Sequence, residues 1–233
     1  MTGMPIATLI SAVIAPALFW SGYLYYKDRF QPEPLLKFGT AYLAGIGAAF
    51  LCLAAFRLLT LAGIPFDPSA LMETGGVPFL IYSLAATGLV EESFKLLPFV
   101  LFVVRFRSFN EKTDGIIYAS AVALGFASVE NIRVLANFEG WELFGRAIAS
   151  PLTHTMFASV WGYAIGCARI RRKPILWPAI MGLGIGATAH GLFNFFSVSP
   201  KLRLGAALLI LVIWIWQIRI LEKAVPRLGR KKA

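Results

Sequence analysis

Long apolar runs, each able to cross a lipid bilayer, are the feature that most constrains this chain. They cover roughly positions 5 to 26, 38 to 62, 77 to 104, 114 to 137, 146 to 168, 175 to 198 and 203 to 221. A membrane-spanning helix needs about 20 predominantly apolar residues, and these runs are continuous rather than alternating as in a β-barrel. With 58% hydrophobic residues among 233, no stretch is left for a soluble domain. The sequence predicts an all-α fold, a polytopic membrane helix bundle of about seven helices forming a single transmembrane domain over residues 1–233.

Lysine and arginine are concentrated in alternate connections between these runs. Sixteen of the 22 lie in the first, third and fifth connections and after the last run: Lys27, Arg29, Lys37, Arg105, Arg107, Lys112, Arg169, Arg171, Arg172, Lys173, Arg219, Lys223, Arg227, Arg230, Lys231 and Lys232. Because cytoplasmic loops hold the excess of basic residues, we expect the N-terminus outside and the C-terminus in the cytoplasm. The net charge of +10 therefore comes from basic residues on the cytoplasmic face, where they set the topology and contact anionic lipids of the bilayer. No nucleic acid partner is expected.

Five ionisable residues interrupt the apolar runs, namely Glu91, Glu92, Glu130, His154 and His190. Such residues are costly in hydrocarbon and usually face a protein-lined cavity with a function. At about 1.5 Å per helical residue, they all lie roughly 20 to 24 Å from the cytoplasmic edge. The sequence therefore predicts one polar cluster in the outer half of the bilayer.

Helical spacing adds supporting residues to this cluster. Lys95 follows Glu92 by three residues and Glu91 by four, so its ammonium can neutralise a carboxylate on the same helical face. Asn194 shares a face with His190, four residues before it. In the fourth run, Phe126 and Asn131 accompany Glu130.

Glutamate and histidine at one level support hydrolysis of a peptide bond by either of two routes. A carboxylate can take a proton from water and return it to a leaving amine, while His and Asn donors stabilise an oxyanion. Alternatively, Glu92, Glu130, His154 and His190 could hold a divalent metal such as Zn. Both routes stay open at this point. Cys52 and Cys167 lack the C-x-x-C spacing of a metal site and are interpreted as packing residues, as is Trp161.

A proton-coupled membrane transporter or channel is the alternative function, because buried Glu and His also relay protons. Transporters usually spread polar groups along a path and often contain an internal repeat. The sequence has neither feature, so hydrolysis is favoured.

Five short motifs occur in chain order: D-x-x-x-PEP at 28–34, EExxK at 91–95, FxxxEN at 126–131, a lone His154, and HxxxN at 190–194. Together they resemble the motifs of the PrsW family of intramembrane proteases. The related CAAX prenyl proteases and bacteriocin-processing enzymes have EExxxR and FxxxH instead. The chain departs from that wider pattern, with Lys95 one place earlier than the Arg and Glu130 in place of a His.

The resemblance implies an intramembrane endopeptidase of the bacterial cytoplasmic (inner) membrane, cleaving single-span membrane proteins such as anti-sigma factors near their extracytoplasmic side. It implies that Glu92 or Glu91 activates water, with a slight preference for Glu92 and with help from Glu130 or His154. His190 and Asn194 would hold the oxyanion. The supporting residues by this resemblance are Lys95, Phe126 and Asn131.

Overall fold

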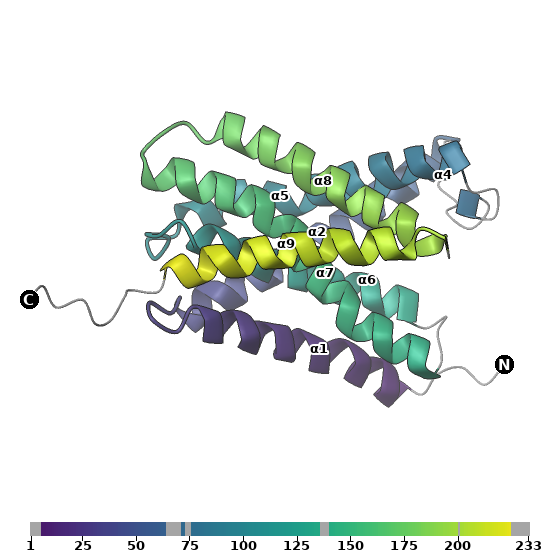
Figure 1. Cartoon of the computed structure of the whole chain (residues 1–233), viewed down its shortest axis with the longest axis horizontal. Coiled ribbons are helices and arrows are strands. Elements are labelled where there is room, and N and C mark those ends of the chain that lie inside the picture. Colours follow the sequence, from purple (N-terminus) through teal and green to yellow (C-terminus); the bar gives the residue numbers. More distant parts are fainter. Residues whose placement is uncertain (1–5, 64–70, 73–75, 136–139, 200, 225–233) are drawn as a thin grey trace, which may run out of the picture.

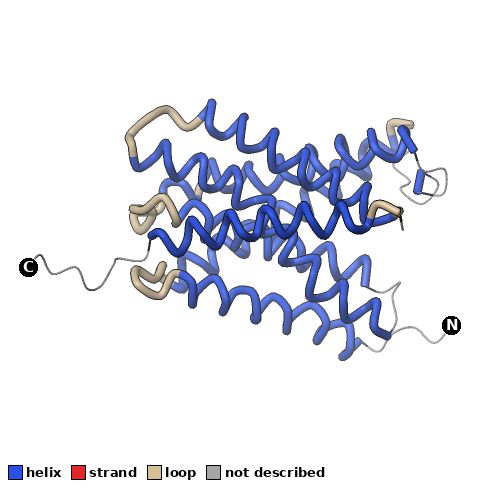
Figure 2. Tube along the Cα trace, in the orientation of Figure 1, coloured by secondary structure: helices blue, strands red, loops and turns tan. Residues whose placement is uncertain are grey.

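The computed structural model describes residues 6–63, 71–72, 76–135, 140–199 and 201–224, and all regular structure within these ranges is helical (Figures 1 and 2). The helices are α1 (Ile6–Lys27), α2 (Leu35–Leu61), α4 (Gly76–Tyr82), the π-helical η1 (Ser83–Val90), α5 (Glu91–Leu101), the 3-10 turn η2 (Val103–Arg105), α6 (Asp114–Leu135), α7 (Gly140–Ile170), α8 (Leu176–Val198) and α9 (Arg203–Ala224). They lie lengthwise beside one another, and α1 begins at the end of the bundle opposite to the end where α9 finishes.

The predicted all-α membrane bundle is confirmed. Five helices in the described ranges are long and apolar enough to cross a membrane, namely α1, α2, α6, α8 and α9. The other two predicted runs, which carry ionisable residues, do not form single helices with the predicted bounds. The run at 77–104 is divided into α4, η1 and α5, and the run at 146–168 lies inside the 31-residue α7, which begins at Gly140.

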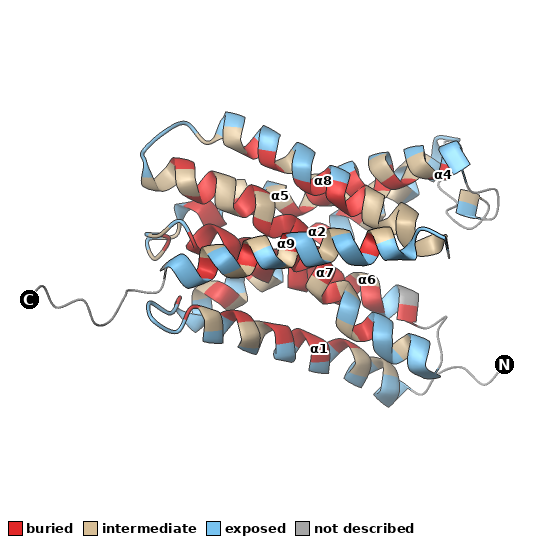
Figure 3. Ribbon diagram, viewed as in Figure 1, coloured by how far each residue is buried: buried red, intermediate tan, exposed pale blue. Residues whose placement is uncertain are grey.

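Helix α6 forms the centre of the bundle. In the most apolar 18-residue segment of α6, 89% of the residues are buried, whereas 22% are buried in the corresponding segments of α1, α2 and α9. Helix α6 packs against α1, α2, α5 and α7. The peripheral helices α1 and α9 have many exposed residues along their length (Figure 3). Large apolar residues are among the exposed ones, for example Leu18, Leu43 and Val212. An apolar surface of this kind suits hydrocarbon rather than water.

Glycine allows α2 and α6 to approach closely at the core. A Cβ atom added at Gly45 would collide with the carbonyl oxygen of Val122, and one at Gly125 would collide with that of Tyr42. Small residues at such crossings are the usual means of packing helices in lipid, where no hydrophobic effect drives helices together. The crossing holds α2 against the segment of α6 that precedes Glu130.

Buried acidic side chains join two connections at the end of the bundle far from the polar cluster. The Asp28 carboxylate accepts a hydrogen bond from the backbone N–H of Glu33 at 2.9 Å, and Glu33 accepts one from the hydroxyl of Tyr118 on α6. Tyr118 is also 2.6 Å from the Ser108 hydroxyl. Asp114, the first residue of α6, accepts two backbone N–H groups from the preceding connection. The D-x-x-x-PEP segment is thereby tied to the start of α6.

We expect Gly→Ala substitutions at two positions of α2 to differ in their effect on stability, because only one of them lies at the crossing with α6. Gly45→Ala forces a methyl group into the Val122 carbonyl and should cost about 1–3 kcal/mol of stability. Gly47→Ala is the matched control, because a Cβ atom there meets nothing within 4 Å, and it should be neutral or slightly stabilising. Unfolding midpoints in detergent micelles measure both effects. Equal midpoints for the two variants would contradict the crossing.

The tied connection predicts a pH dependence of stability. Burial raises the pKa of Asp28 from its usual 3.8 to about 7, against the opposing effect of its hydrogen bond from Glu33. Because the folded-state pKa is raised, this stabilising contribution is complete below about pH 4 and is lost as the pH rises through about 7. Asp28→Asn keeps an acceptor and stays neutral, so it should escape that loss, which is of the order of 1 kcal/mol after solvent screening.

Thermal unfolding of both proteins between pH 4 and pH 8 measures this difference. Glu33 and Glu111 also face Asp28 and are the same in both proteins, so only the difference between the curves reports on Asp28. Parallel curves would show that folding does not raise the pKa of Asp28.

Candidate active site

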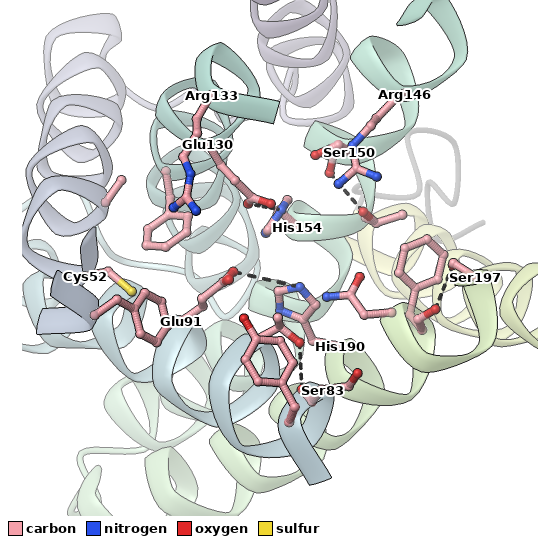
Figure 4. Close-up of a pocket in the computed structure, with 18 of the residues that line it drawn as sticks. Cys52, Ser83, Glu91, Glu130, Arg133, Arg146, Ser150, His154, His190 and Ser197 are labelled. Carbon is pink, nitrogen blue, oxygen red and sulfur yellow. Dashed lines mark hydrogen bonds and ion pairs between the residues drawn. The ribbon is translucent and has the colours of Figure 1, made fainter. Parts of the chain in front are cut away.

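Four helices bring the predicted ionisable residues together at one level of the bundle (Figure 4). Glu91 and Glu92 begin α5, Glu130 lies on α6, His154 on α7 and His190 on α8. The ring centroids of the two histidines are 4.9 Å apart. The polar cluster therefore exists as a single group of side chains rather than as separate pairs.

The π-helical turn η1 places the two glutamates. A π-helix adds a residue to the turn and is frequent at functional sites, and here it ends directly before Glu91. Glycine lets η1 lie against α8: a Cβ atom at Gly191 would come within 2.7 Å of the Leu84 Cα, and one at Gly88 would collide with the Ala187 carbonyl. The close approach puts His190, the neighbour of Gly191, beside the start of α5.

Glu92 is completely buried and bound by three donors. Lys95 Nζ donates to its Oε1 at 2.7 Å, His190 Nδ1 donates to the same oxygen at 3.0 Å, and Trp161 Nε1 donates to Oε2 at 3.0 Å. A carboxylate with these partners is stable inside the protein but has no exposed oxygen to offer a substrate. Glu92 instead fixes the ring of His190, whose Nε2 is left to face Glu91 at 4.0 Å.

Lys95 connects the two halves of the cluster. Its ammonium is 2.7 Å from His154 Nδ1 as well as from Glu92, and it lies 4.5 Å from the centroid of the Phe126 ring. Since an ammonium can only donate, His154 Nδ1 accepts from Lys95, and its Nε2 lies 2.9 Å from Glu130 Oε2. A metal ion that bound Nε2 would displace the proton carried there. Glu92, Lys95, His154 and Glu130 thus lie in one row of close polar contacts.

A cavity of about 1000 Å³ meets the cluster on one side. Its walls come from α2, α4, η1, the start of α5, α6, α7 and α8. Of the predicted site residues it is lined by Glu91, Glu130, His154, His190 and Asn194, together with Phe126. Glu92, Lys95 and Asn131 are buried and do not line it. The cluster therefore has a layer that faces the cavity and a layer behind it.

The layer facing the cavity fits a divalent metal ion. One ligand atom each from Glu91, His154 and His190 lie within 4.8 Å of one another, and carboxylate oxygen with imidazole nitrogen is a common zinc donor set. In the described residues, Glu91 Oε2 is buried without a hydrogen-bond partner. His190 also has the arrangement typical of a metal ligand, because its second nitrogen donates to a carboxylate. Of the four ligands predicted from sequence, His154 and His190 belong to this group, Glu92 and Glu130 do not, and Glu91 supplies its carboxylate.

Two residues of the site were not singled out from the sequence. Trp161, interpreted there as a packing residue, donates to Glu92, and Phe157 stacks on the His190 ring with centroids 4.8 Å apart. Both follow His154 on α7, at spacings of seven and three residues. Those spacings put them on the face of α7 that carries His154, which is the only signal in the sequence for their role.

Known proteins resemble this chain over most of its length. A family model described as PrsW family intramembrane metalloprotease matches residues 33–219. Protease PrsW of Geobacillus kaustophilus is 28% identical over 93% of this chain and 92% of its own length. Protease PrsW of Clostridioides difficile is 30% identical over 92% and 90% of the two chains, and that of Bacillus subtilis 28% over 80% and 81%. No solved structure matches the fold.

The matched region contains α2 to α8 and every residue of the polar cluster. This extent agrees with the motifs at 91–95, 126–131 and 190–194 lying on the helices that build the site. The chain therefore belongs to the PrsW family of intramembrane metalloproteases.

Proposed function

We propose that this protein cleaves single-span membrane proteins, anti-sigma factors among them, near their extracytoplasmic side in a bacterial cytoplasmic membrane. The observation that carries the proposal is the group of Glu91, His154 and His190 at the cavity, with ligand atoms within 4.8 Å of one another. The chain would cross the membrane seven times with its C-terminus inside. The cavity reaches the end of the bundle where α2 and α6 end and α7 begins, which is the side with few basic residues.

The packing of the cavity walls supports entry of a substrate from the lipid. Neighbouring walls are closed where α2 packs on α6, α6 on α7, α7 on α8, and α8 on η1. Between α2 and α4, the described residues make almost no backbone approach, although both helices line the cavity through residues such as Leu53 and Phe79. A single helix could reach the cavity through this seam without unfolding in water.

A divalent ion such as zinc, held by Glu91, His154 and His190, would supply the Lewis acidity that eases deprotonation of water and polarises a carbonyl. Glu130 is the remaining carboxylate of the cavity, and 29% of its side chain is exposed. We assign to it the role of general base, taking a proton from the attacking water and returning it to the leaving amine.

The remaining residues position these groups and stabilise charge. The buried Glu92 holds His190 through Nδ1, and Lys95 holds His154. Asn194 lies one helical turn after His190 and lines the cavity, so its amide can donate to the carbonyl oxygen as negative charge develops there. Glu92 then acts through His190 rather than on the substrate.

Cleavage of tagged single-span proteins by the purified protein in liposomes tests this assignment. Glu130→Gln should lower kcat by about 10²–10⁴-fold, and Glu91→Gln should abolish cleavage together with stoichiometric zinc binding. A chelator should inhibit the wild type reversibly, with zinc restoring activity. Glu142→Gln, at an exposed position on α7, is the matched control and should cleave normally.

Two results would contradict the proposal. Undiminished cleavage in both Glu91→Gln and Glu130→Gln would remove the catalytic roles from these residues. Cleavage that survives complete removal of metal, but not Glu91→Gln, would replace the metal-assisted route with one based on carboxylates alone.

A further inference from the structure

Three arginines line the cavity at the end away from Glu91 and His190, and we call them the arginine rim: Arg57 on α2, Arg133 on α6 and Arg146 on α7. All three are exposed. Figure 4 shows the side chains of Arg133 and Arg146 directed into the cavity from different helices, above the level of Glu91 and His190. The roles assigned to the catalytic cluster do not use any of them.

The charges of the cavity are separated by depth. Of the described residues that line it, Glu91 and Glu130 carry the only carboxylates, and both belong to the catalytic cluster. The intervening walls are largely apolar, with residues such as Leu53, Phe79 and Phe193. Positive side chains gathered at one end of a cleft with apolar walls attract a ligand of the opposite sign, so the arginine rim is suited to an anionic group.

We propose that the arginine rim binds acidic side chains of the substrate, in the segment that follows its membrane span. This inference rests on the proposed function, because it concerns the substrate of the same site. Arginine is suited to this task, since its guanidinium binds carboxylates through paired hydrogen bonds. The apolar walls would take the end of the substrate span, and the rim would take the charged residues beyond it.

Helical spacing gives the position of those acidic residues. Arg133 is three residues past Glu130 on α6 and Arg146 is eight residues before His154 on α7, which places them about 4.5 and 12 Å from the cluster along the helices. An extended peptide advances about 3.3 Å per residue. The substrate would therefore carry Asp or Glu about two to four residues from the cleaved bond, on the side away from its span.

A charge scan of the substrate tests the inference. A single-span substrate is prepared with Glu, Gln or Lys at successive positions after the cleaved bond, and kcat/KM is measured in liposomes of neutral phosphatidylcholine. The wild type should prefer Glu over Gln about threefold to tenfold at the two-to-four-residue positions, and not farther out. Arg133→Gln should lose the preference nearer the bond and Arg146→Gln the one farther away, while Arg146→Glu should favour Lys.

Arg107→Gln, at an exposed position in the connection before α6, is the control and should keep the wild-type profile. Equal losses for Glu, Gln and Lys substrates in the rim variants would overturn the inference. So would an effect of the rim variants that appears only when anionic phosphatidylglycerol is added, which would assign the rim to lipid headgroups.

The failure of this inference is distinguishable from failure of the proposed function. Cleavage by the wild type with no charge preference would refute the rim and leave the protease intact. If no substrate is cleaved, a binding measurement still tests the inference. Fluorescent peptides with Glu or Gln at the same positions are titrated with the Glu130→Gln protein. Preferential binding of the Glu peptides would support the rim, and equal binding would refute it.

Discussion

The burial of one carboxylate organises the rest of the site. Glu92 has no exposed surface, and an uncompensated charge in such surroundings would cost several kcal/mol. Its three partners, Lys95, His190 and Trp161, come from α5, α8 and α7. Satisfying this carboxylate therefore fixes the relative positions of three helices, and it also fixes the orientation of the His190 ring. Loss of any one partner would leave part of a buried charge without compensation.

Close backbone approach makes those contacts possible. A Cβ atom at Gly182 would come within 2.6 Å of the Trp161 Cα, and one at Gly186 within 2.8 Å of the Phe157 carbonyl oxygen, so α7 and α8 meet beside the cluster. With Gly191 against η1, α8 is held between two neighbours at short distance. Small residues thus bring the helices near enough for short polar contacts, in a solvent that offers the backbone no alternative partners.

The sequence was sufficient to predict the helices, the common level of the polar residues and the partnership of Lys95 with Glu92, because these follow from apolar length, helical rise and an i,i+3 spacing. It was not sufficient to decide which of Glu91 and Glu92 faces the cavity. Adjacent residues point about 100° apart on a helix, and η1 shifts the register in a way that its apolar residues do not reveal. The role of Trp161 was missed because nothing in the sequence distinguishes a tryptophan that only packs from one whose Nε1–H also donates a hydrogen bond.

We propose that the cluster has two layers, with Glu91, His154 and His190 placed to hold a metal ion and Glu92 behind them. X-ray absorption at the zinc edge of the zinc-loaded protein tests this arrangement. We expect a first shell of nitrogen and oxygen only, with imidazole scattering that weakens in His154 and His190 variants. A sulfur ligand at about 2.3 Å would contradict the claim, because it would place Cys52, which also lines the cavity, in the metal site. A spectrum of hydrated zinc without imidazole would contradict it equally.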